Sequence, residues 1–280
     1  MNFLSLDPIL RQAIQEDLGR GDITTDAILQ TNAGTDRVTT AQILARENLV
    51  LAGWPLFVHV FELLGPVQSL ANYEEGDWVN SDCIGTVEGK ISVLLKAERV
   101  ALNFLQRLCG IATLTREYVE LLTPTKVQLL DTRKTTPLWR SIEKYAVRMG
   151  GGQNHRMGLD DGILIKENHI TAAGGVLQAV LACRKRCSHL QKIQVEVTTE
   201  KELALAVEAQ ADIILLDNMS PEETQRAVSF CAGRCLLEIS GGISQQNLMT
   251  YAKTGVDFIS VGALTHSVPS INISMLLDQN

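Results

Sequence analysis

The sequence predicts a mixed α/β protein with two domains, an α+β domain followed by a parallel β/α barrel of fewer than eight strands. Three observations lead to this prediction. Residues 1–123 contain short alternating runs joined by glycine turns, whereas residues 124–267 alternate apolar strands with amphipathic helices. In addition, the predicted strands of the second part end in polar or charged residues or in glycine turns. We therefore expect the domain boundary between residues 123 and 124.

The first domain is predicted from two kinds of periodicity. Residues 38–45 and 84–91 alternate apolar and polar side chains, which is typical of half-buried strands. Residues 54–64 and 97–122 repeat apolar side chains at the spacing of a helical face. This mixture predicts an α+β domain of roughly a hundred residues.

The second domain is predicted from a repeated unit of strand, turn and helix. We expect strands at 127–130, 162–165, 193–197, 212–216, 236–239 and 257–261, and helices at 136–149, 174–187, 199–209, 221–231 and 244–254. Alternating strands and helices with right-handed crossovers form a parallel sheet. Eight complete units normally need roughly 200 residues, so this segment is too short for a full eight-stranded barrel.

The residues at the carboxyl ends of these strands favour a barrel over an open sheet. In a barrel the strand ends converge on one axis, whereas an open sheet offers a single crevice. The residues at these ends are Asp131 to Lys134, Lys166, Glu196, Asp217, Ser240 to Gly242, and Gly262. Their spread over all the predicted strands indicates a functional site at the carboxyl ends of a barrel.

The charge distribution predicts a small anionic ligand. The chain has 25 Lys and Arg against 32 Asp and Glu, a net charge of −7, yet one segment is rich in cations. That segment contains Arg133, Lys134, Arg140, Lys144, Arg148, His155, Arg156, Lys166 and His169. A local excess of positive charge concentrates an anion, and neighbouring glycines let backbone N–H groups approach it. A nucleic-acid surface is not expected, because the pI is near 5.3 and aromatic residues are only 5%.

No segment of the sequence predicts export or membrane insertion. The first residues lack the basic start and apolar core of a signal peptide, and no later run approaches the roughly 18 apolar residues of a membrane span. We therefore expect a cytoplasmic location and no membrane partner.

Lys166 leaves two functional interpretations open. It follows an apolar strand, so its amine is expected at the mouth of the barrel. It could clamp an anion, or it could form a Schiff base as in barrel aldolases. Surrounding positive charge favours a neutral amine and hence a Schiff base, whereas the neighbouring arginines favour anion binding.

Two carboxylates and two glycine turns complete the predicted site. Glu196 and Asp217 occupy equivalent positions in successive units, where they are either solvated loop charges or ligands of a hard cation. We favour the cation, because Mg²⁺ usually takes one or two carboxylates together with substrate oxygens. The turns at 240–242 and 261–263 follow the last two predicted strands, where barrels commonly bind phosphate.

Five motifs together resemble the nicotinate-nucleotide pyrophosphorylases, also called quinolinate phosphoribosyltransferases. They are Glu16 to Thr25, Glu98 to Asn103, Asp131 to Pro137, Asn154 to Arg156, and Glu238 to Ile243. The motifs span nearly the whole chain in order, which makes the match far more specific than any one of them. The resemblance implies an N-terminal α/β sandwich, to which residues 268–280 return, and an incomplete, about seven-stranded TIM-like β/α barrel.

The resemblance also implies an activity. Members of the family are decarboxylating pentosyltransferases of NAD biosynthesis, which join quinolinate to 5-phosphoribosyl-1-pyrophosphate with Mg²⁺ and form nicotinate mononucleotide, pyrophosphate and CO2. Both substrates are strongly anionic, so a site rich in cations suits them. The pyridine nitrogen attacks with its own lone pair, and the alkylated ring stabilises the carbanion left by CO2. Positioning and charge stabilisation would then carry the catalysis.

Roles for particular residues follow from the resemblance. The residues expected at quinolinate and the donor phosphates are Arg99, Arg133, Arg156 and Lys166, with Thr132, Lys134 and His155 beside them. Glu196 and Asp217 are expected at the ribose hydroxyls and Mg²⁺, and together with Lys134 and Lys166 they form the expected catalytic set. The residues expected at the 5-phosphate are Ser240, Gly241, Gly242, Val261, Gly262 and Ala263.

Oligomeric state and substrate are the remaining expectations. Arg99 precedes the barrel, so we expect it to act in the site of a neighbouring subunit of a homodimer, which could assemble further. Three alternatives stay open at this point: a related phosphoribosyltransferase with another substrate, a Schiff-base aldolase centred on Lys166, and a non-catalytic anion-binding module.

Overall fold

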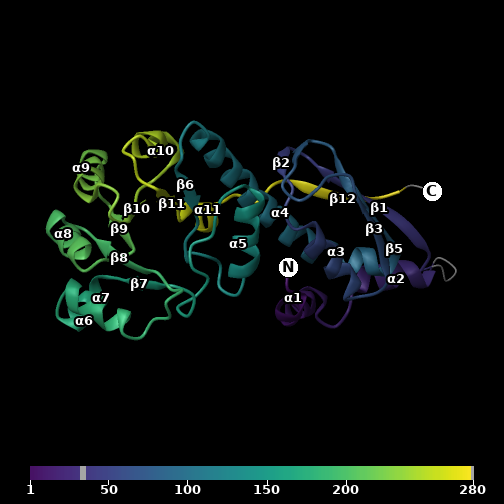
Figure 1. Ribbon diagram of the computed structural model, residues 1–280. Coiled ribbons are helices and arrows are strands. Elements are labelled where there is room, and N and C mark those ends of the chain that lie inside the picture. The colour runs from purple at the N-terminus through teal and green to yellow at the C-terminus, as the bar shows by residue number, and fades with distance from the viewer. Residues whose placement is uncertain (32–35, 279–280) are drawn as a thin grey trace. The chain divides into compact units, whose positions relative to one another are not determined.

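The computed structural model describes residues 1–31 and 36–278. The chain divides into two compact units (Figure 1). The first comprises residues 1–116, 137–151 and 268–280, and the second comprises residues 117–136 and 152–267. This division differs from the expected boundary at residues 123 and 124, since residues 137–151 belong to the first unit and not to the barrel.

The first unit is built on an antiparallel sheet. Its strands are β1 (Val38–Ala45), β3 (Val67–Ala71), β5 (Cys83–Lys90) and β12 (Ile273–Leu277), in the order β12-β1-β5-β3. All three pairings are antiparallel, and β12 brings the C-terminal segment to the edge of the sheet beside β1. A separate two-stranded ladder joins β2 (Asn48–Val50) to β4 (Trp78–Asn80).

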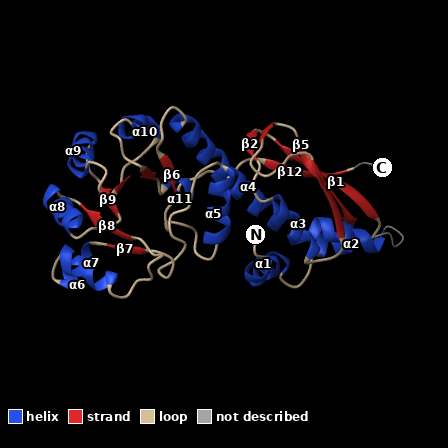
Figure 2. Ribbon diagram, viewed as in Figure 1, coloured by secondary structure: helices blue, strands red, loops and turns tan. Residues whose placement is uncertain are grey.

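Helices complete the first unit (Figure 2). They are α1 (Phe3–Leu18), α2 (Ile23–Thr31), α3 (Trp54–Glu62), α5 (Arg140–Met149) and the part of α4 (Ile91–Leu122) up to residue 116. Helix α1 was not predicted, because Pro8 lies within the stripe of Leu6, Leu10 and Ile14 that the helix buries. Helix α4 was predicted, although it begins six residues earlier than expected.

Polar contacts explain why α5 belongs to the first unit. The guanidinium of Arg107, on α4, donates to the fully buried carboxylate of Glu143, on α5, at 3.0 Å. Glu75 accepts hydrogen bonds from the backbone N–H of Trp54 at 2.8 Å and from the hydroxyl of Tyr145 at 2.6 Å. These partners are distant in sequence, so the periodicity that predicted the helix could not show where it packs.

The second unit is a parallel sheet with helices outside it (Figure 2). Its strands are β6 (Gln128–Leu130), β7 (Ile163–Ile165), β8 (Ile193–Val197), β9 (Ile213–Asp217), β10 (Leu236–Ser240) and β11 (Phe258–Ser260). Their order is β6-β11-β10-β9-β8-β7, and every pairing is parallel. The predicted strands therefore match the observed ones to within one residue at either end.

The helices of the second unit mostly follow the prediction. They are α6 (Glu167–Ala173), α7 (Val176–Arg184), α8 (Glu200–Glu208), α9 (Pro221–Cys231), α10 (Gln245–Ala252) and the short α11 (Ala263–His266). Capping boxes fix the start of α8, with Thr199 and Glu202, and of α9, with Ser220 and Glu223. In the part of the chain that is described, no helix combines the length and apolarity needed to cross a membrane.

The sheet has six strands within the described residues, one fewer than the seven or so that the resemblance implied. Gln153 occupies the place of a further strand, where it forms a single parallel bridge with Leu130. Its N–H donates to Leu129 at 2.8 Å, and its carbonyl accepts from Asp131 at 3.1 Å. The ladder stops there because the N–H of His155, which would form the next hydrogen bond of a strand, donates to the Asp131 carboxylate at 2.8 Å.

Candidate active site

Alternation of side chains along the parallel strands builds a cavity at their carboxyl ends. On β8, Glu196 lines the cavity, whereas its buried neighbours Val195 and Val197 do not. The register then places Ser240 opposite Asp217, so residues of adjacent strands share one face. The cavity has a volume of about 580 Å³, which is within the usual range for a small-molecule site.

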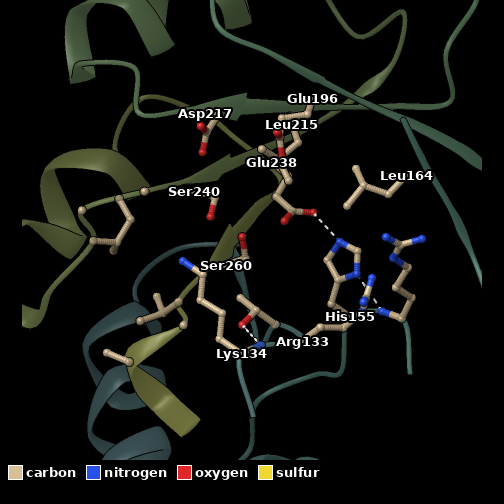
Figure 3. Close-up of a pocket in the computed structure, with 18 of the residues that line it drawn as sticks. Arg133, Lys134, His155, Leu164, Glu196, Leu215, Asp217, Glu238, Ser240 and Ser260 are labelled. Carbon is tan, nitrogen blue, oxygen red and sulfur yellow. Dashed lines mark hydrogen bonds and ion pairs between the residues drawn. The ribbon is translucent and has the colours of Figure 1, made fainter. Parts of the chain in front are cut away.

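The structure brings together every predicted site residue except Arg99. Those that line the cavity are Thr132, Arg133, Lys134, His155, Arg156, Lys166, Glu196, Asp217, Ser240, Gly241, Gly242, Val261, Gly262 and Ala263. Figure 3 shows Asp217, Glu196 and Ser240 on one side of the cavity, Arg133 and His155 on the other, and Glu238 between them. Arg99 is exposed on α4 in the first unit, where it borders a separate hollow together with Glu16 and Trp139.

Arg156 is a half-buried cation whose hydrogen bonds are incomplete. One of its Nη atoms donates to the carbonyl of Gly162 at 2.9 Å, but its Nε is buried without a hydrogen-bond partner. Burial lowers the pKa of the Arg156 guanidinium, and the nearby charge of Arg133 lowers it further, while Asp161 opposes the shift. Two neighbouring cations that repel each other in this way are stabilised by an anion placed between them.

Both ring nitrogens of His155 are engaged by neighbouring groups. Its Nδ1 accepts the backbone N–H of Arg156 at 2.7 Å, so the ring proton is on Nε2. Nε2 lies 2.9 Å from Oε1 of Gln194, the carbonyl oxygen of that amide. The Oε2 atom of Glu238 lies 3.8 Å from the same Nε2, so the ring is fixed in orientation at the edge of the site.

Lys166 and Glu196 form an ion pair across the ends of β7 and β8. A Schiff-base nucleophile must present a free amine to its substrate, whereas the amine of Lys166 is engaged by the carboxylate of Glu196. Of the two interpretations of Lys166, the geometry thus favours the anion clamp.

Asp217 is fixed by the residue that follows it. Asn218 donates from its side chain to Asp217 Oδ2 at 2.8 Å and from its backbone N–H to the carbonyl of Ser240 at 2.9 Å. Asn218 adopts a left-handed backbone conformation, with φ of 56°. Asparagine tolerates this conformation better than most side chains, so the pair Asp217-Asn218 sets the direction of the carboxylate.

Close approach explains the glycine at position 241. Its φ is 97°, and a Cβ there would lie 2.1 Å from Oδ1 of Asn218. Gly242, with φ of 64°, also has a conformation that favours glycine. This turn and the one at Gly262 border the cavity with backbone and leave room for a ligand such as phosphate.

Several lining residues were missed by sequence reasoning. They are Leu164, Leu215, Glu238, Ile243, Ser260 and His266. Glu238 had a usable signal, because it lies two residues before Ser240 on a strand and therefore faces the same side. The other residues carry no charge pattern that separates them from ordinary core or loop positions.

The carboxylates of the cavity can bind a metal ion only together with a ligand. No group of three or more His, Cys, Asp or Glu side chains that could hold a metal ion occurs among residues 1–31 and 36–278. Two carboxylates at adjacent strand ends, Glu196 and Asp217, are nevertheless sufficient for Mg²⁺ when a substrate supplies the remaining oxygens. The residues therefore fit a Mg²⁺ ion that arrives with a phosphate-bearing ligand and do not form a self-contained metal site.

The fold and the site together define a class: a barrel-like α/β protein that binds small anions at the carboxyl ends of parallel strands. Residues 22–109 match the family model "Quinolinate phosphoribosyl transferase, N-terminal domain", and residues 111–276 match the model of the C-terminal domain of the same family. The chain belongs to the quinolinate phosphoribosyl transferase family.

Similar proteins cover almost the whole chain. A "Probable nicotinate-nucleotide pyrophosphorylase [carboxylating]" of Bacillus subtilis is 42% identical over 277 residues, 98% of this chain and 94% of the relative. A protein of Mycobacterium leprae with the same name, without "Probable", is 42% identical over 274 residues, 95% of each chain. Among solved structures, NadC from Streptococcus pyogenes is 39% identical with a TM-score of 0.93, covering 99% of this chain and 98% of its own. The nicotinate-nucleotide pyrophosphorylase from Francisella tularensis is 42% identical with a TM-score of 0.92, covering 98% and 96%.

Proposed function

We propose that this chain transfers the phosphoribosyl group of 5-phosphoribosyl-1-pyrophosphate to the ring nitrogen of quinolinate and releases pyrophosphate and CO2, with nicotinate mononucleotide as the product. The observation that carries the proposal is the incompletely bonded Arg156 beside Arg133, in a cavity that also contains two carboxylates and two glycine turns. The names of the relatives, "pyrophosphorylase [carboxylating]", describe the same reaction read in the reverse direction.

In this mechanism the arginines and Lys166 hold the carboxylates of quinolinate. Planar guanidinium groups bind carboxylates through two parallel hydrogen bonds, so Arg133 and Arg156 orient the ring as well as attract it. His155 is held at this edge of the cavity by Gln194. Once the ring is oriented, its nitrogen lone pair is directed at the ribose carbon without the help of a base.

The opposite side of the cavity receives the ribosyl donor. Glu196 and Asp217 would hold Mg²⁺ together with the donor's phosphate oxygens, and one of the two accepts a hydrogen bond from a ribose hydroxyl. When bound, Mg²⁺ would supply positive charge to the leaving pyrophosphate. Lys134, whose side chain lies beside Gly262, provides a second positive charge for the pyrophosphate. The turns at Gly241 and Gly262 bind the 5-phosphate, with their backbone N–H groups as donors.

The proposed reaction is tested by incubating the protein with quinolinate, 5-phosphoribosyl-1-pyrophosphate and Mg²⁺ and following nicotinate mononucleotide and pyrophosphate. We expect both products in equal amounts and only with both substrates present. Borohydride trapping serves as the control for the aldolase alternative: a covalent adduct on Lys166, or binding of both ligands without pyrophosphate release, would contradict the proposal.

We also propose that the active form is a homodimer in which Arg99 serves the site of the partner subunit. Arg99 is exposed and does not line the cavity of its own chain, and a two-fold interface is the simplest way for it to reach such a cavity. Mixing inactive Arg99→Ala with inactive Glu196→Ala should restore activity to roughly a quarter of wild type, the fraction of sites with both residues intact in a random mixture. Verified subunit exchange without restored activity would refute the shared site. A cytoplasmic location remains a prediction from the sequence.

A further inference from the structure

Glu238 is a buried carboxylate in the middle of the cavity. It lies at the centre of β10, its side chain is 2% exposed, and it borders the same cavity as Asp217 and Ser240. Figure 3 shows its carboxylate between His155 on one side and the serines of β10 and β11 on the other. Burying a carboxyl group that is not fully hydrogen-bonded is costly, so its position in this cavity requires a function that offsets the cost.

The Oε2 atom of Glu238 begins a chain of hydrogen bonds that ends at Arg156. The amide of Gln194 donates to Oε2 at 2.7 Å, which directs the Gln194 carbonyl towards His155. That carbonyl accepts Nε2–H of His155 at 2.9 Å, and Nδ1 of His155 then accepts the backbone N–H of Arg156 at 2.7 Å. Glu238 thus sets the orientation of the Gln194 amide. Through that amide it sets the orientation of the His155 ring, which in turn holds the backbone N–H of Arg156.

The Oε1 atom of Glu238 is buried and has no hydrogen-bond partner. A carboxylate with a purely structural function is satisfied on both oxygens, as Asp131 is by the backbone N–H of His155 at 2.8 Å and the amide of Asn154 at 2.6 Å. The open oxygen therefore calls for a donor from a ligand. Quinolinate at neutral pH carries two carboxylates and a ring nitrogen lone pair, none of which donates, whereas the ribosyl donor has two ribose hydroxyls.

We propose that Glu238 joins the two halves of the site, with Oε2 positioning Arg156 through Gln194 and His155, and with Oε1 accepting a hydroxyl of the ribosyl donor. This inference rests on the proposed function for the identity of the two substrates. Glu238 then binds the ribosyl donor through Oε1 and positions Arg156, which binds quinolinate, through Oε2.

The variant Glu238→Gln separates the two functions of the carboxylate. Its amide oxygen can keep accepting from Gln194, which places the NH2 group where Oε1 was and replaces an acceptor by a donor. We expect the Kd and KM of the ribosyl donor to rise roughly tenfold or more, as for other lost hydrogen bonds to charged groups. Quinolinate affinity, the melting temperature and the ring ¹⁵N signals of His155 should be unchanged.

The variant Gln194→Met is the matched control, because it keeps the length of the side chain and removes both of its hydrogen bonds. Here the ¹⁵N signals of His155, assigned with His155→Asn among the five histidines of the chain, should change, and quinolinate affinity should fall. If this variant does not fold, the same measurement can be made on Gln194→Asn, whose side chain is too short to bridge Glu238 and His155.

Unaltered affinity for the ribosyl donor in Glu238→Gln overturns the assignment of Oε1. Unaltered His155 signals in the Gln194 variant overturn the positioning chain. These outcomes are distinguishable from a failure of the proposed function, since the latter would show as wild-type protein that binds neither substrate, while the ¹⁵N measurement needs no substrate.

Discussion

Among the described residues, the buried charged groups of the first unit are paired, whereas two charged side chains around the cavity of the second unit each leave a buried atom without a hydrogen-bond partner. In the first, Glu143 is paired with Arg107, and Glu75 accepts from Tyr145 as well as from backbone. In the second, Nε of Arg156 and Oε1 of Glu238 are buried without a partner. Within the described residues one further atom of this kind is found, the hydroxyl of Thr39 on β1, which is uncharged and so costs less to bury than an ion.

This difference indicates which polar groups stabilise the fold and which ones bind a ligand. A polar group that is satisfied by the protein contributes to folding, whereas a charged group left open near a cavity is completed by a ligand. Substitutions in the first unit should therefore alter the free energy of unfolding, and substitutions around the cavity should alter affinity. The following predictions test that separation, from the largest expected effect to the smallest.

Glu143→Ala should lower the free energy of unfolding by about 3 to 5 kcal/mol, because it leaves the mostly buried Arg107 without its carboxylate. Denaturant unfolding measures the change. Quinolinate affinity should be retained at temperatures where the variant is folded. A variant as stable as wild type would show that the pair does not support the first unit.

Arg133→Ala and Arg156→Ala should each cost on the order of 2 to 5 kcal/mol of quinolinate binding, since each change removes a bidentate carboxylate partner that the bound ligand would shield from water. Their melting temperatures should stay close to wild type. Calorimetric titration decides, with Arg226→Ala on the exposed face of α9 as the matched control that should bind normally. Normal quinolinate affinity in both cavity variants would show that the clamp is misassigned.

Glu196→Gln and Asp217→Asn should each weaken use of the ribosyl donor and its Mg²⁺ dependence more than quinolinate affinity, by roughly 1.5 to 3 kcal/mol as for hydrogen bonds to charged groups. Steady-state titration of each substrate and of Mg²⁺ gives the comparison. If the quinolinate constant alone changes, the two halves of the cavity have been exchanged in our assignment.

His59 should give the smallest effect, a dependence of stability on pH in the first unit. Burial acts to lower the pKa of His59, but hydrogen bonds to Glu62 and Asp7 outweigh it and raise the pKa above the ordinary 6.5. A raised pKa in the folded state means that this contribution is fully present below pH 6.5 and is lost as the pH rises through the folded-state value. Melting temperatures across this range should show the loss in wild type and not in His59→Gln.

The barrel-like sheet could be predicted in detail because each strand there is a short apolar run bounded by turns. Glu196 and Asp217 could be selected as well, since they are charges at the ends of such runs. The sequence pattern grouped residues 137–151 with the barrel, whereas they fall in the first unit here. The pattern of α5 shows that it is a helix, but its partners Arg107 and Glu75 are more than thirty positions away in the sequence.

Protonation and hydrogen-bond state lie beyond what residue types can show. The sequence shows His155 only as one of several basic residues, whereas the structure shows that its Nδ1 accepts the backbone N–H of Arg156. Glu238 was quoted in a motif without a role, since nothing in the sequence distinguishes a carboxylate with an open oxygen from one that is fully bonded like Asp131. The open atoms are visible only when the partners are brought together in three dimensions.

Release of CO2 from quinolinate labelled in its 2-carboxylate tests the central claim most directly. With 5-phosphoribosyl-1-pyrophosphate and Mg²⁺, we predict one labelled CO2 for each nicotinate mononucleotide formed, loss of both in Arg156→Ala, and retention of both in Arg226→Ala. Pyrophosphate release from nicotinate without CO2, or folded wild-type protein that forms no labelled CO2 from quinolinate, would contradict the account.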